Sequence, residues 1–421
     1  MKILWTSNII FPELSNKIHK KYYSTVGGGW MYSLANLIKK DVHLAIVCIH
    51  SAKRREVINN IHYYLLPQIN KDTWNEIISD FRPDIIHIHG TEYPHTLKIR
   101  ELSPNIPCII SIQGIVSIYA KYALGGIPSY LFYKNRTIKD YIKSSNPIYI
   151  QKDLSNRGKY ERQLIKKNTY FIGRTQWDYS HIKSLNPNAT YFKCNEVIRD
   201  SFYNGKWDYN NIIKNTIFCS NSSVPLKGIH HIIMALPIII REIPTTHLRI
   251  AGKNIIGKLS IKERLKMSGY DLYLRRLIYK LNLENHITFL GHLNEKEMKE
   301  EFLKTNLFVL PSDIENSPNT LAEAQLLGVP IVASYVGGIP DMMPYPLSEW
   351  LYRNEEIEIL AQKIIKAFNI NKWDEYIKTC QSIAHKRHSK NIIRETILNI
   401  YYNVLNKSNE KIFINNSQNI I

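Results

Sequence analysis

Two glutamates flank the predicted start of a short helix late in the chain. Glu315 and Glu323 are separated by seven residues, and between them Ser317 is a good helix cap and Pro318 suits the first helical position. The start of a helix offers free backbone N–H groups and a positive dipole end, which suit a phosphate or sugar hydroxyls. Two carboxylates on either side of such an anion site could hold a ribose and a hexose. The pattern therefore favours a nucleotide-sugar site over two surface glutamates on an ordinary helix.

A lysine and a run of glycines form the second group of candidate residues. Lys227 lies just after a predicted strand, in the segment Ser222–Gly228, where its charge can neutralise a diphosphate leaving group. Gly27, Gly28 and Gly29 follow the first predicted strand and open a helix. Consecutive glycines permit the backbone to approach a phosphate closely, although a flexible turn explains them equally well.

Two histidines lie at the end of another predicted strand, in the segment Asp84–Gly90. We expect the side chains of His87 and His89 to point to opposite faces of the sheet, with one of them near the ligand. A buried histidine with satisfied hydrogen bonds is the alternative interpretation of each.

Short apolar runs rich in β-branched residues predict the strands that position these side chains. They are Ile3–Trp5, His43–Ile49, Ile85–His89 and Cys108–Ile112, followed by Thr216–Cys219, His247–Ile250, Ile287–Leu290, Leu307–Leu310 and Ile331–Ala333. Helix-like stretches lie between the runs. This alternation predicts an α/β protein with two Rossmann-like, doubly wound parallel-sheet domains. Because ligands bind at the carboxyl ends of such strands, we expect the two domains to face one cleft.

The predicted boundaries divide the chain into four parts. Residues 1–200 form the acceptor-side domain, and residues 201–385 form the nucleotide-sugar donor domain. We expect a helix over 386–405 to cross back to the first domain, followed by a polar tail over 406–421. The polar segment Asn195–Asn215 is the candidate hinge.

The E-x7-E spacing of Glu315 and Glu323 resembles that of the family-4 glycosyltransferases, and the resemblance extends from the N-terminus to about residue 405. Members of this family have the GT-B fold and retain the anomeric configuration. The resemblance implies that Glu315 contacts hydroxyls of the donor sugar and that Glu323 binds ribose hydroxyls. It also implies that the N–H groups of Asn319 and Thr320 reach the sugar or the phosphate.

The chain departs from the family at two positions. Members often read G-R-x-x-P-x-K-G around Lys227, but Ser222 stands here where the arginine would be. Gln113 stands where many members carry a histidine near the reacting sugar. Arg174 is the candidate substitute for the missing cation, with an ion pair to Asp178 at a helix start as the alternative.

Three further segments resemble parts of the family's site, although each could be a simple turn. Gly27–Gly29 resembles the glycine loop beside the donor phosphate and the acceptor. Gly291 and His292 resemble the loop whose backbone contacts the base, and Gly337–Asp341 resembles a loop that lines the cleft. The stretch Gly173–Asp178 resembles a segment of members linked to surface or capsular polysaccharide synthesis.

The sequence contains neither a DxD motif nor carboxylates and histidines at metal-ligand spacing. We therefore expect no metal and no cofactor apart from the donor, a UDP- or GDP-sugar. Leaving-group charge then falls to Lys227, helix dipoles and Arg174. The candidate catalytic residues are Glu315, Lys227, Gln113 and His89.

The charge balance favours an anionic partner, since 55 Lys and Arg against 36 Asp and Glu give a net charge of +19. Many cations lie between Lys134 and Lys167 among tyrosines, which fits either a solvated basic face or a membrane surface. No apolar run approaches the ~20 residues that span a bilayer. Five scattered cysteines favour a reducing compartment. We expect a cytoplasmic protein, peripheral on the inner face of the plasma membrane.

These features predict a retaining glycosyltransferase that acts on a glycan or polyprenyl-linked acceptor in polysaccharide synthesis. The alternative from another class is a basic, non-catalytic binding protein for a nucleic acid or a membrane surface. Since no RNP, helix-turn-helix or zinc-finger pattern occurs, we expect no nucleic-acid partner. A third interpretation is a degenerate donor-binding subunit, because of Ser222 and Gln113.

Overall fold

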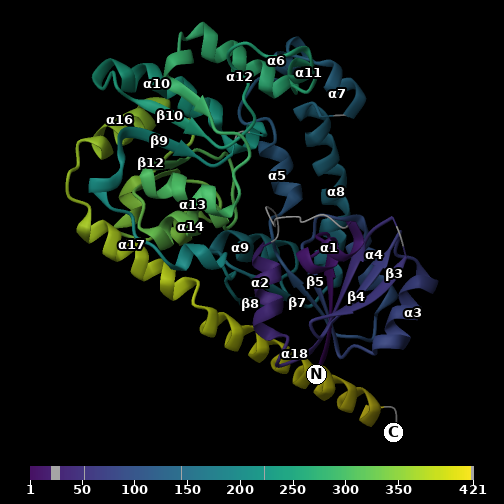
Figure 1. Ribbon diagram of the computed structural model, residues 1–421. Helices are drawn as coiled ribbons and strands as arrows, with labels where there is room; N and C mark the ends of the chain where they lie inside the picture. Colours follow the sequence, from purple (N-terminus) through teal and green to yellow (C-terminus); the bar gives the residue numbers. More distant parts are fainter. Residues whose placement is uncertain (20–28, 52, 144, 222, 419–421) are drawn as a thin grey trace. The chain divides into compact units, whose positions relative to one another are not determined.

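The chain forms two compact units in the computed structural model, each built on a parallel sheet (Figure 1). The first unit contains Met1–Val116, Arg157–Ile198 and His388–Ile421, and the second contains Ser117–Asn156 and Arg199–Arg387. The structure describes residues 1–19, 29–51, 53–143, 145–221 and 223–418. It defines each unit by itself, so the expected cleft stays a prediction.

The sheet of the first unit has eight strands in the order β3-β4-β2-β1-β5-β6-β7-β8. Their bounds are β1 Lys2–Ser7, β2 His43–Ile49, β3 Arg54–Ile58, β4 Ile61–Leu66, β5 Ile85–His89, β6 Cys108–Ser111, β7 Tyr170–Gly173 and β8 Thr190–Lys193. All neighbouring strands are parallel except β3 and β4. The central strands are buried along nearly their whole length, as expected for a sheet covered on both faces.

In the described residues, the helices that lie mainly in the first unit are α1 Pro12–His19, α2 Gly29–Ile38, α3 Lys71–Phe81, α4 Pro94–Leu102, the second half of α8 Pro147–Lys167, α9 Gln176–Leu185 and α18 Lys390–Gln418. Helix α18 returns the chain to this unit, since Ile393, Ile397 and Ile400 join one core cluster with Ile3 and Trp5 of β1. The helix continues to Gln418 through most of the segment that we expected to be a polar tail.

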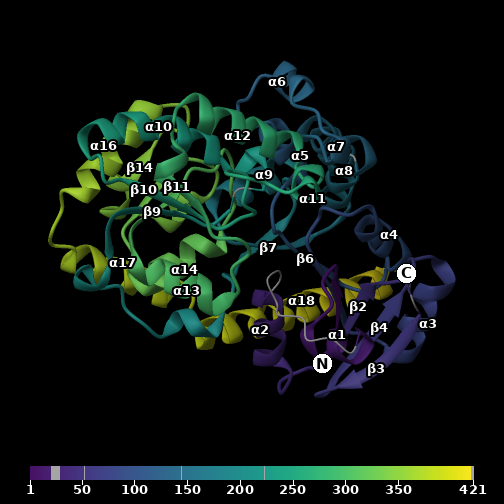
Figure 2. The ribbon, with the colours of Figure 1, turned by 45° about the horizontal axis from the view of Figure 1, so that its top comes forward.

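The second unit has a six-stranded, wholly parallel sheet in the order β11-β10-β9-β12-β13-β14. The strands are β9 Ile213–Cys219, β10 His247–Ile250, β11 Ile287–Phe289, β12 Thr305–Leu310, β13 Ile331–Ser334 and β14 Leu351–Tyr352. The α-helices after β9 are α10 Ile229–Glu242, α11 Ile261–Leu265, α12 Gly269–Lys280, α13 Glu295–Lys304, α14 Asn319–Leu327, α15 Ile339–Met342, α16 Ile357–Phe368 and α17 Asp374–Arg387. Figures 1 and 2 show α10 and α16 on one face of this sheet and α13 and α14 on the other.

Residues 117–156, which we expected in the first domain, pack with the second unit. They include most of α5 Val116–Tyr122, all of α6 Ser129–Lys134 and α7 Ile138–Lys143, and the start of α8. The carbonyl of Gly125 accepts from His230 Nε2 at 2.8 Å, and the hydroxyl of Thr137 donates to the carbonyl of Met267 at 2.8 Å. These contacts join residues far apart in sequence, so local sequence patterns do not reveal them.

Among the described residues, no helix is both long and apolar enough to cross a bilayer.

Candidate functional site

Glu315 lies in a buried loop between β12 and α14, and its carboxylate is held by two donors. Oε1 accepts from Lys227 Nζ at 2.6 Å and from the hydroxyl of Ser312 at 2.9 Å. The Glu315 residue is 6% exposed, while the side chain of Lys227 is 28% exposed. The structure therefore brings two of the predicted catalytic residues together, and the lysine retains access to solvent.

A second loop, which contains Gly337 and Gly338, packs against the backbone carbonyl of Glu315. Gly337 has φ 52°, and a Cβ at this position would lie 1.8 Å from the carbonyl oxygen of Glu315. The neighbouring N–H of Gly338 donates to the same oxygen at 3.0 Å. Only glycine permits both this backbone conformation and this approach, so Gly337 fixes the position of the Glu315 backbone.

The turn that carries Lys227 is joined to the same loop. Residues Pro225–Lys227 form a 3-10 turn after β9, and Gly228 ends it with φ 68°. A Cβ on Gly228 would lie 1.7 Å from the carbonyl oxygen of Pro311, and the N–H of Asp313 donates to the carbonyl of Leu226 at 2.9 Å. The Lys227–Glu315 contact thus rests on backbone packing. Ser222 lies outside the described residues.

Helix α14 spans Asn319–Leu327, so only the expected cap, Ser317, and the expected first helical position, Pro318, lie one residue too early. Its N-cap is Pro318 and not Ser317, because Pro318 is extended, with ψ 123°. Within the part of the chain that the structure describes, the backbone N–H groups of Asn319 and Thr320 donate to no protein acceptor. Gly328 ends the helix in the left-handed conformation with φ 77°, as predicted. The start of the helix therefore presents free backbone N–H donors shortly after Glu315 in the sequence.

Glu323 lies in α14, is 2% exposed, and forms an ion pair with a residue that our sequence analysis did not single out. Arg199 Nε and Nη2 approach Glu323 Oε1 at 2.8 and 2.7 Å. Oε2 is buried and has no hydrogen-bond partner among the described residues. Burial raises the pKa of Glu323 from 4.5 to about 7, although Arg199 opposes the shift. The orphaned oxygen can accept a hydrogen bond from a ligand hydroxyl.

The loop with Gly291 and His292 follows β11 and is tied to the loop after β10. Gly291 has φ 77°, and it exchanges backbone hydrogen bonds of 2.9 and 3.0 Å with Gly252. The side chain of His292 is exposed. The expected contact of this loop with a base stays a prediction.

One group of buried side chains has metal-ligand types within 4.8 Å of one another in the described residues: His230, His231 and Asp313. Both ring nitrogens of His230 are engaged, one by the hydroxyl of Tyr270 and the other by a backbone carbonyl. Asp313 Oδ1 is approached by His231 at 3.2 Å and accepts from Asn354 at 2.8 Å. These contacts connect the cluster to the loop before Glu315, while His231 Nδ1 and Asp313 Oδ2 are buried without a hydrogen-bond partner among the described residues.

The two histidines of β5 do not point to opposite faces, so this expectation is wrong. The ring centroids of His87 and His89 are 4.0 Å apart. Residues i and i+2 of a strand share a face, whereas only adjacent residues alternate. His87 is fully engaged, since its two ring nitrogens lie 2.7 Å from the hydroxyls of Tyr401 and Ser111.

His89 is a buried ring without hydrogen-bond partners for either nitrogen among the described residues. Its ring centroid is 4.4 Å from that of Trp5 and 5.5 Å from that of Trp30. Desolvation holds the pKa of His89 well below its usual value. The neutral ring can therefore accept or donate one hydrogen bond but carries no charge to stabilise an anion.

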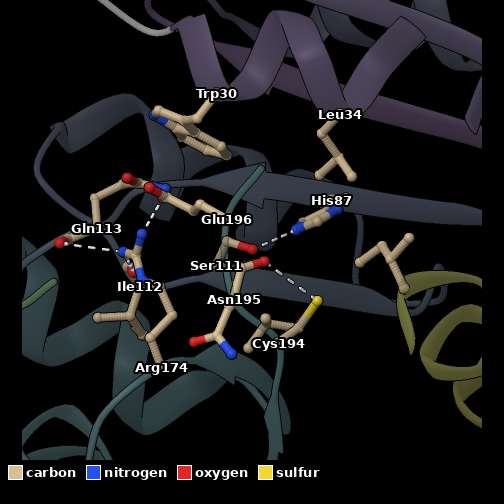
Figure 3. A pocket seen from close by; sticks show the side chains of 12 residues that line it. Trp30, Leu34, His87, Ser111, Ile112, Gln113, Arg174, Cys194, Asn195 and Glu196 are labelled. Atoms are coloured by element: carbon tan, nitrogen blue, oxygen red, sulfur yellow. Dashed lines mark hydrogen bonds and ion pairs between the residues drawn. The ribbon is translucent and has the colours of Figure 1, made fainter. Parts of the chain in front are cut away.

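Arg174 and Gln113 line a small pocket of about 20 Å³ in the first unit, which has room for roughly one water (Figure 3). The Arg174 guanidinium pairs with Glu196 and donates to the backbone carbonyls of Ile112 and Gln113. The alternative ion pair with Asp178 is wrong, since Asp178 accepts instead from the backbone N–H of Arg174 at 3.0 Å. The role of Arg174 as a diphosphate cation stays a prediction.

Of the three predicted glycines, Gly29 is the first residue of α2, while Gly27 and Gly28 lie outside the described residues. The expected phosphate contact of this loop therefore stays a prediction.

The family model described as Glycosyl transferases group 1 matches residues 210–384, which include Lys227, Glu315 and Glu323. A GDP-mannose-dependent monoacylated alpha-(1-6)-phosphatidylinositol monomannoside mannosyltransferase of Corynebacterium glutamicum is 26% identical over 157 residues, which is 36% of this chain and 37% of the relative. The amylovoran biosynthesis glycosyltransferase AmsK of Erwinia amylovora is 29% identical over 102 residues, or 23% of this chain and 25% of the relative. The chain spans about a third of the length of the curated relatives it matches.

Solved structures resemble the whole fold at low identity. A sucrose-phosphate synthase from Thermosynechococcus elongatus superposes with a TM-score of 0.68 at 12% identity, covering 96% of this chain and 99% of that one. Anabaena Alr3699/HepE in complex with UDP gives a TM-score of 0.65 at 15% identity, covering 95% and 99%. These structures confirm the predicted fold. The chain therefore carries a glycosyl transferases group 1 domain, and its two parallel-sheet units have the GT-B fold.

Proposed function

We propose that the protein is a retaining glycosyltransferase of the family-4 type. It moves a sugar from a UDP- or GDP-sugar to a hydroxyl of a glycan or polyprenyl-linked acceptor in polysaccharide synthesis. The observation that carries the proposal is the contact between Lys227 Nζ and Glu315 Oε1, at 2.6 Å, directly before the free N-terminus of α14.

In this proposal, the diphosphate of the donor binds beside this contact. Lys227 supplies a partly exposed cation, and the N–H groups of Asn319 and Thr320 supply uncharged donors at a positive helix end. Glu315 keeps Lys227 in place, and its second oxygen can accept from hydroxyls of the donor sugar. A phosphate bound to Lys227 and the α14 N–H groups would therefore lie next to the Glu315 carboxylate, which binds hydroxyls of the transferred sugar.

The ribose of the donor binds at Glu323 in this proposal, four residues further into α14 than Asn319. Its Oε1 is held by Arg199, so the carboxyl group is fixed while the buried Oε2 is left to accept a ribose hydroxyl. Burying that hydroxyl against an otherwise unpaired oxygen removes the cost of the orphaned acceptor, typically about 1–3 kcal/mol.

The reaction breaks the bond between the anomeric carbon and the diphosphate oxygen and forms a bond from the same carbon, on the same face, to the acceptor oxygen. The acceptor proton passes to the departing phosphate. Lys227 and the helix end stabilise the negative charge that develops on the diphosphate. We propose that this stabilisation suffices without a metal ion, so chelation with EDTA should leave turnover unchanged.

The names of related proteins support the donor class and the setting. One structural relative was solved with UDP, one curated relative is named as GDP-mannose-dependent, and another is named for amylovoran biosynthesis. A polyprenyl-linked acceptor would place the enzyme at the inner face of the plasma membrane.

A ligand-detected NMR screen of UDP- and GDP-sugars against the full chain tests the proposal. We expect one donor to bind and to be hydrolysed slowly, and Glu315→Ala to abolish turnover. Binding without any turnover, unchanged in Glu315→Ala, would instead identify a non-catalytic subunit. Absence of binding to every donor, together with steeply salt-dependent binding to arbitrary DNA, would reject the proposal in favour of a basic binding protein.

A further inference from the structure

Helices α6 and α7 expose apolar side chains to an unusual degree for so short a segment. Tyr141 is 67% exposed and Ile142 is 76% exposed, and Tyr130, Tyr133 and Ile138 are each more than half exposed. Residues of this kind normally turn inward, and a group of them on one surface marks a site of interaction.

A second segment, far away in sequence, adds to this surface. Helix α11 exposes Ile261, at 78%, and Leu265, at 51%. The hydroxyl of Thr137, just before α7, donates to the carbonyl of Met267, just after α11, at 2.8 Å. This contact places the end of α11 beside the start of α7 in the second unit (Figure 1), and α6 packs against α12, the helix that follows α11. We call this combined surface the α6–α11 face; it consists of residues 129–143 and 258–266.

The α6–α11 face is strongly cationic. Its two segments contain eight Lys and Arg residues: Lys134, Arg136, Lys139, Lys143, Lys258, Lys262, Arg264 and Lys266. They contain only two acidic residues, and both serve as local caps. Asp140 is buried and accepts from the backbone N–H of Thr137, and Glu263 accepts from the backbone N–H of Ser260 at 2.8 Å. The positive charge is therefore not balanced within the face.

The combination of charge and apolar surface selects the partner. Cations and aromatic rings suffice to bind nucleic acid. Exposed aliphatic residues such as Ile142 and Ile261 make no favourable contact with phosphates or solvated bases. At a bilayer, aliphatic side chains enter the acyl boundary, tyrosines lie among the headgroups, and lysines meet anionic lipids. We propose that the α6–α11 face binds the surface of an anionic membrane. This inference does not depend on glycosyl transfer.

Vesicle flotation of the full chain tests the proposal, with phosphatidylcholine vesicles compared with vesicles that contain about one third phosphatidylglycerol. We expect binding to the anionic vesicles only, weakened by salt. A triple variant, Lys143→Gln, Lys262→Gln and Lys266→Gln, should bind at least tenfold more weakly, since each cation near an anionic leaflet contributes about fivefold. The matched control is Lys372→Gln, Lys378→Gln and Lys386→Gln, three exposed lysines elsewhere in the second unit.

The apolar contribution needs its own pair of variants. Tyr141→Ser with Ile142→Ser should weaken vesicle binding at least tenfold at unchanged net charge, since each buried apolar side chain contributes about tenfold or more. The control is Tyr345→Ser with Ile359→Ser, which are exposed in the same unit. Circular dichroism and thermal unfolding establish that each variant is folded.

The proposal is overturned if the chain ignores anionic vesicles, if test and control variants behave alike, or if DNA competes the chain off the vesicles completely. Donor binding measured without vesicles keeps this outcome separate from the fate of the proposed function.

Discussion

Arg199 holds one oxygen of the Glu323 carboxyl group, at 2.8 Å from its Nε, while the other oxygen is buried without a hydrogen-bond partner in the described part of the chain. The carboxyl group is thus positioned but only half satisfied. Its pKa, raised to about 7 by burial, reports the same imbalance, because one cation does not offset complete desolvation.

The first prediction concerns the stability of the ligand-free protein. Because the folded-state pKa of Glu323 lies above its unfolded value of 4.5, the folded state binds the proton more tightly. This contribution to stability is therefore present at low pH and is lost as the pH rises through about 7. Relative to Glu323→Gln, the wild type should lose up to about 3 kcal/mol between about pH 5 and about pH 8. Urea unfolding of both proteins measures the difference.

The control is Glu375→Gln at an exposed glutamate of α17, which should run parallel to the wild type at every pH. If Glu323→Gln also runs parallel to the wild type, Glu323 is not protonated near neutral pH and the orphaned oxygen has another explanation.

The second prediction concerns Lys227. In Lys227→Met the diphosphate loses its cation and Glu315 loses its 2.6 Å partner, so kcat with the preferred donor should fall by about 10²–10³-fold. Since the two side chains act as a unit, Glu315→Gln combined with Lys227→Met should cost much less than the product of the two single losses. Steady-state donor turnover gives all four rates.

Lys378→Met, at an exposed lysine of the same unit, should leave turnover unchanged. Multiplicative losses in the double variant would show that the two side chains contribute independently, without the coupling expected from their 2.6 Å contact.

The sequence predicts a strand or a site residue well when one continuous segment determines it. The apolar runs of β2 and β5 predict those strands with their observed bounds, because buried parallel strands are apolar along nearly their whole length. Strand β10 is also predicted with its observed bounds, although its burial alternates. Strands β3, β4, β7, β8 and β14 were not predicted. The charged, mostly exposed β3 lacks that pattern, whereas β4 is buried along most of its length and does have it. The E-x7-E spacing locates Glu315 and Glu323 in one loop and helix. It says nothing of Arg199, which a distant polar segment contributes, or of residues 117–156, which pack through long-range contacts.

The third prediction tests the glycine behind Glu315. Gly337→Ala places a Cβ 1.8 Å from a backbone carbonyl oxygen, so the loop must move and Glu315 with it. We expect donor affinity to fall at least tenfold and stability to fall by about 2 kcal/mol or more. The matched control is Gly257→Ala, which has a similar φ of 74° but nothing within 4 Å of the added atom. Calorimetric donor titration should find that this control binds normally, and equal losses in both would attribute the effect to φ alone.

The fourth prediction concerns Tyr401, which ties α18 to the sheet of the first unit. Its hydroxyl oxygen accepts from Trp5 Nε1 at 3.0 Å, so the hydroxyl proton is free to donate to His87 Nδ1 at 2.7 Å. His87 then carries its own proton on Nε2 and donates it to Ser111. In Tyr401→Phe a buried indole N–H loses its acceptor and a buried imidazole nitrogen loses its donor.

Each orphaned group costs about 1–3 kcal/mol, so we expect a loss of about 2–4 kcal/mol and a fall in Tm of roughly 5 °C or more. Tyr402→Phe is the control, since Tyr402 is the next residue and is 54% exposed. Thermal unfolding followed by circular dichroism compares the two. A Tyr401→Phe variant as stable as Tyr402→Phe would mean that water replaces the hydroxyl, and α18 would then be held by its apolar residues without help from this chain of hydrogen bonds.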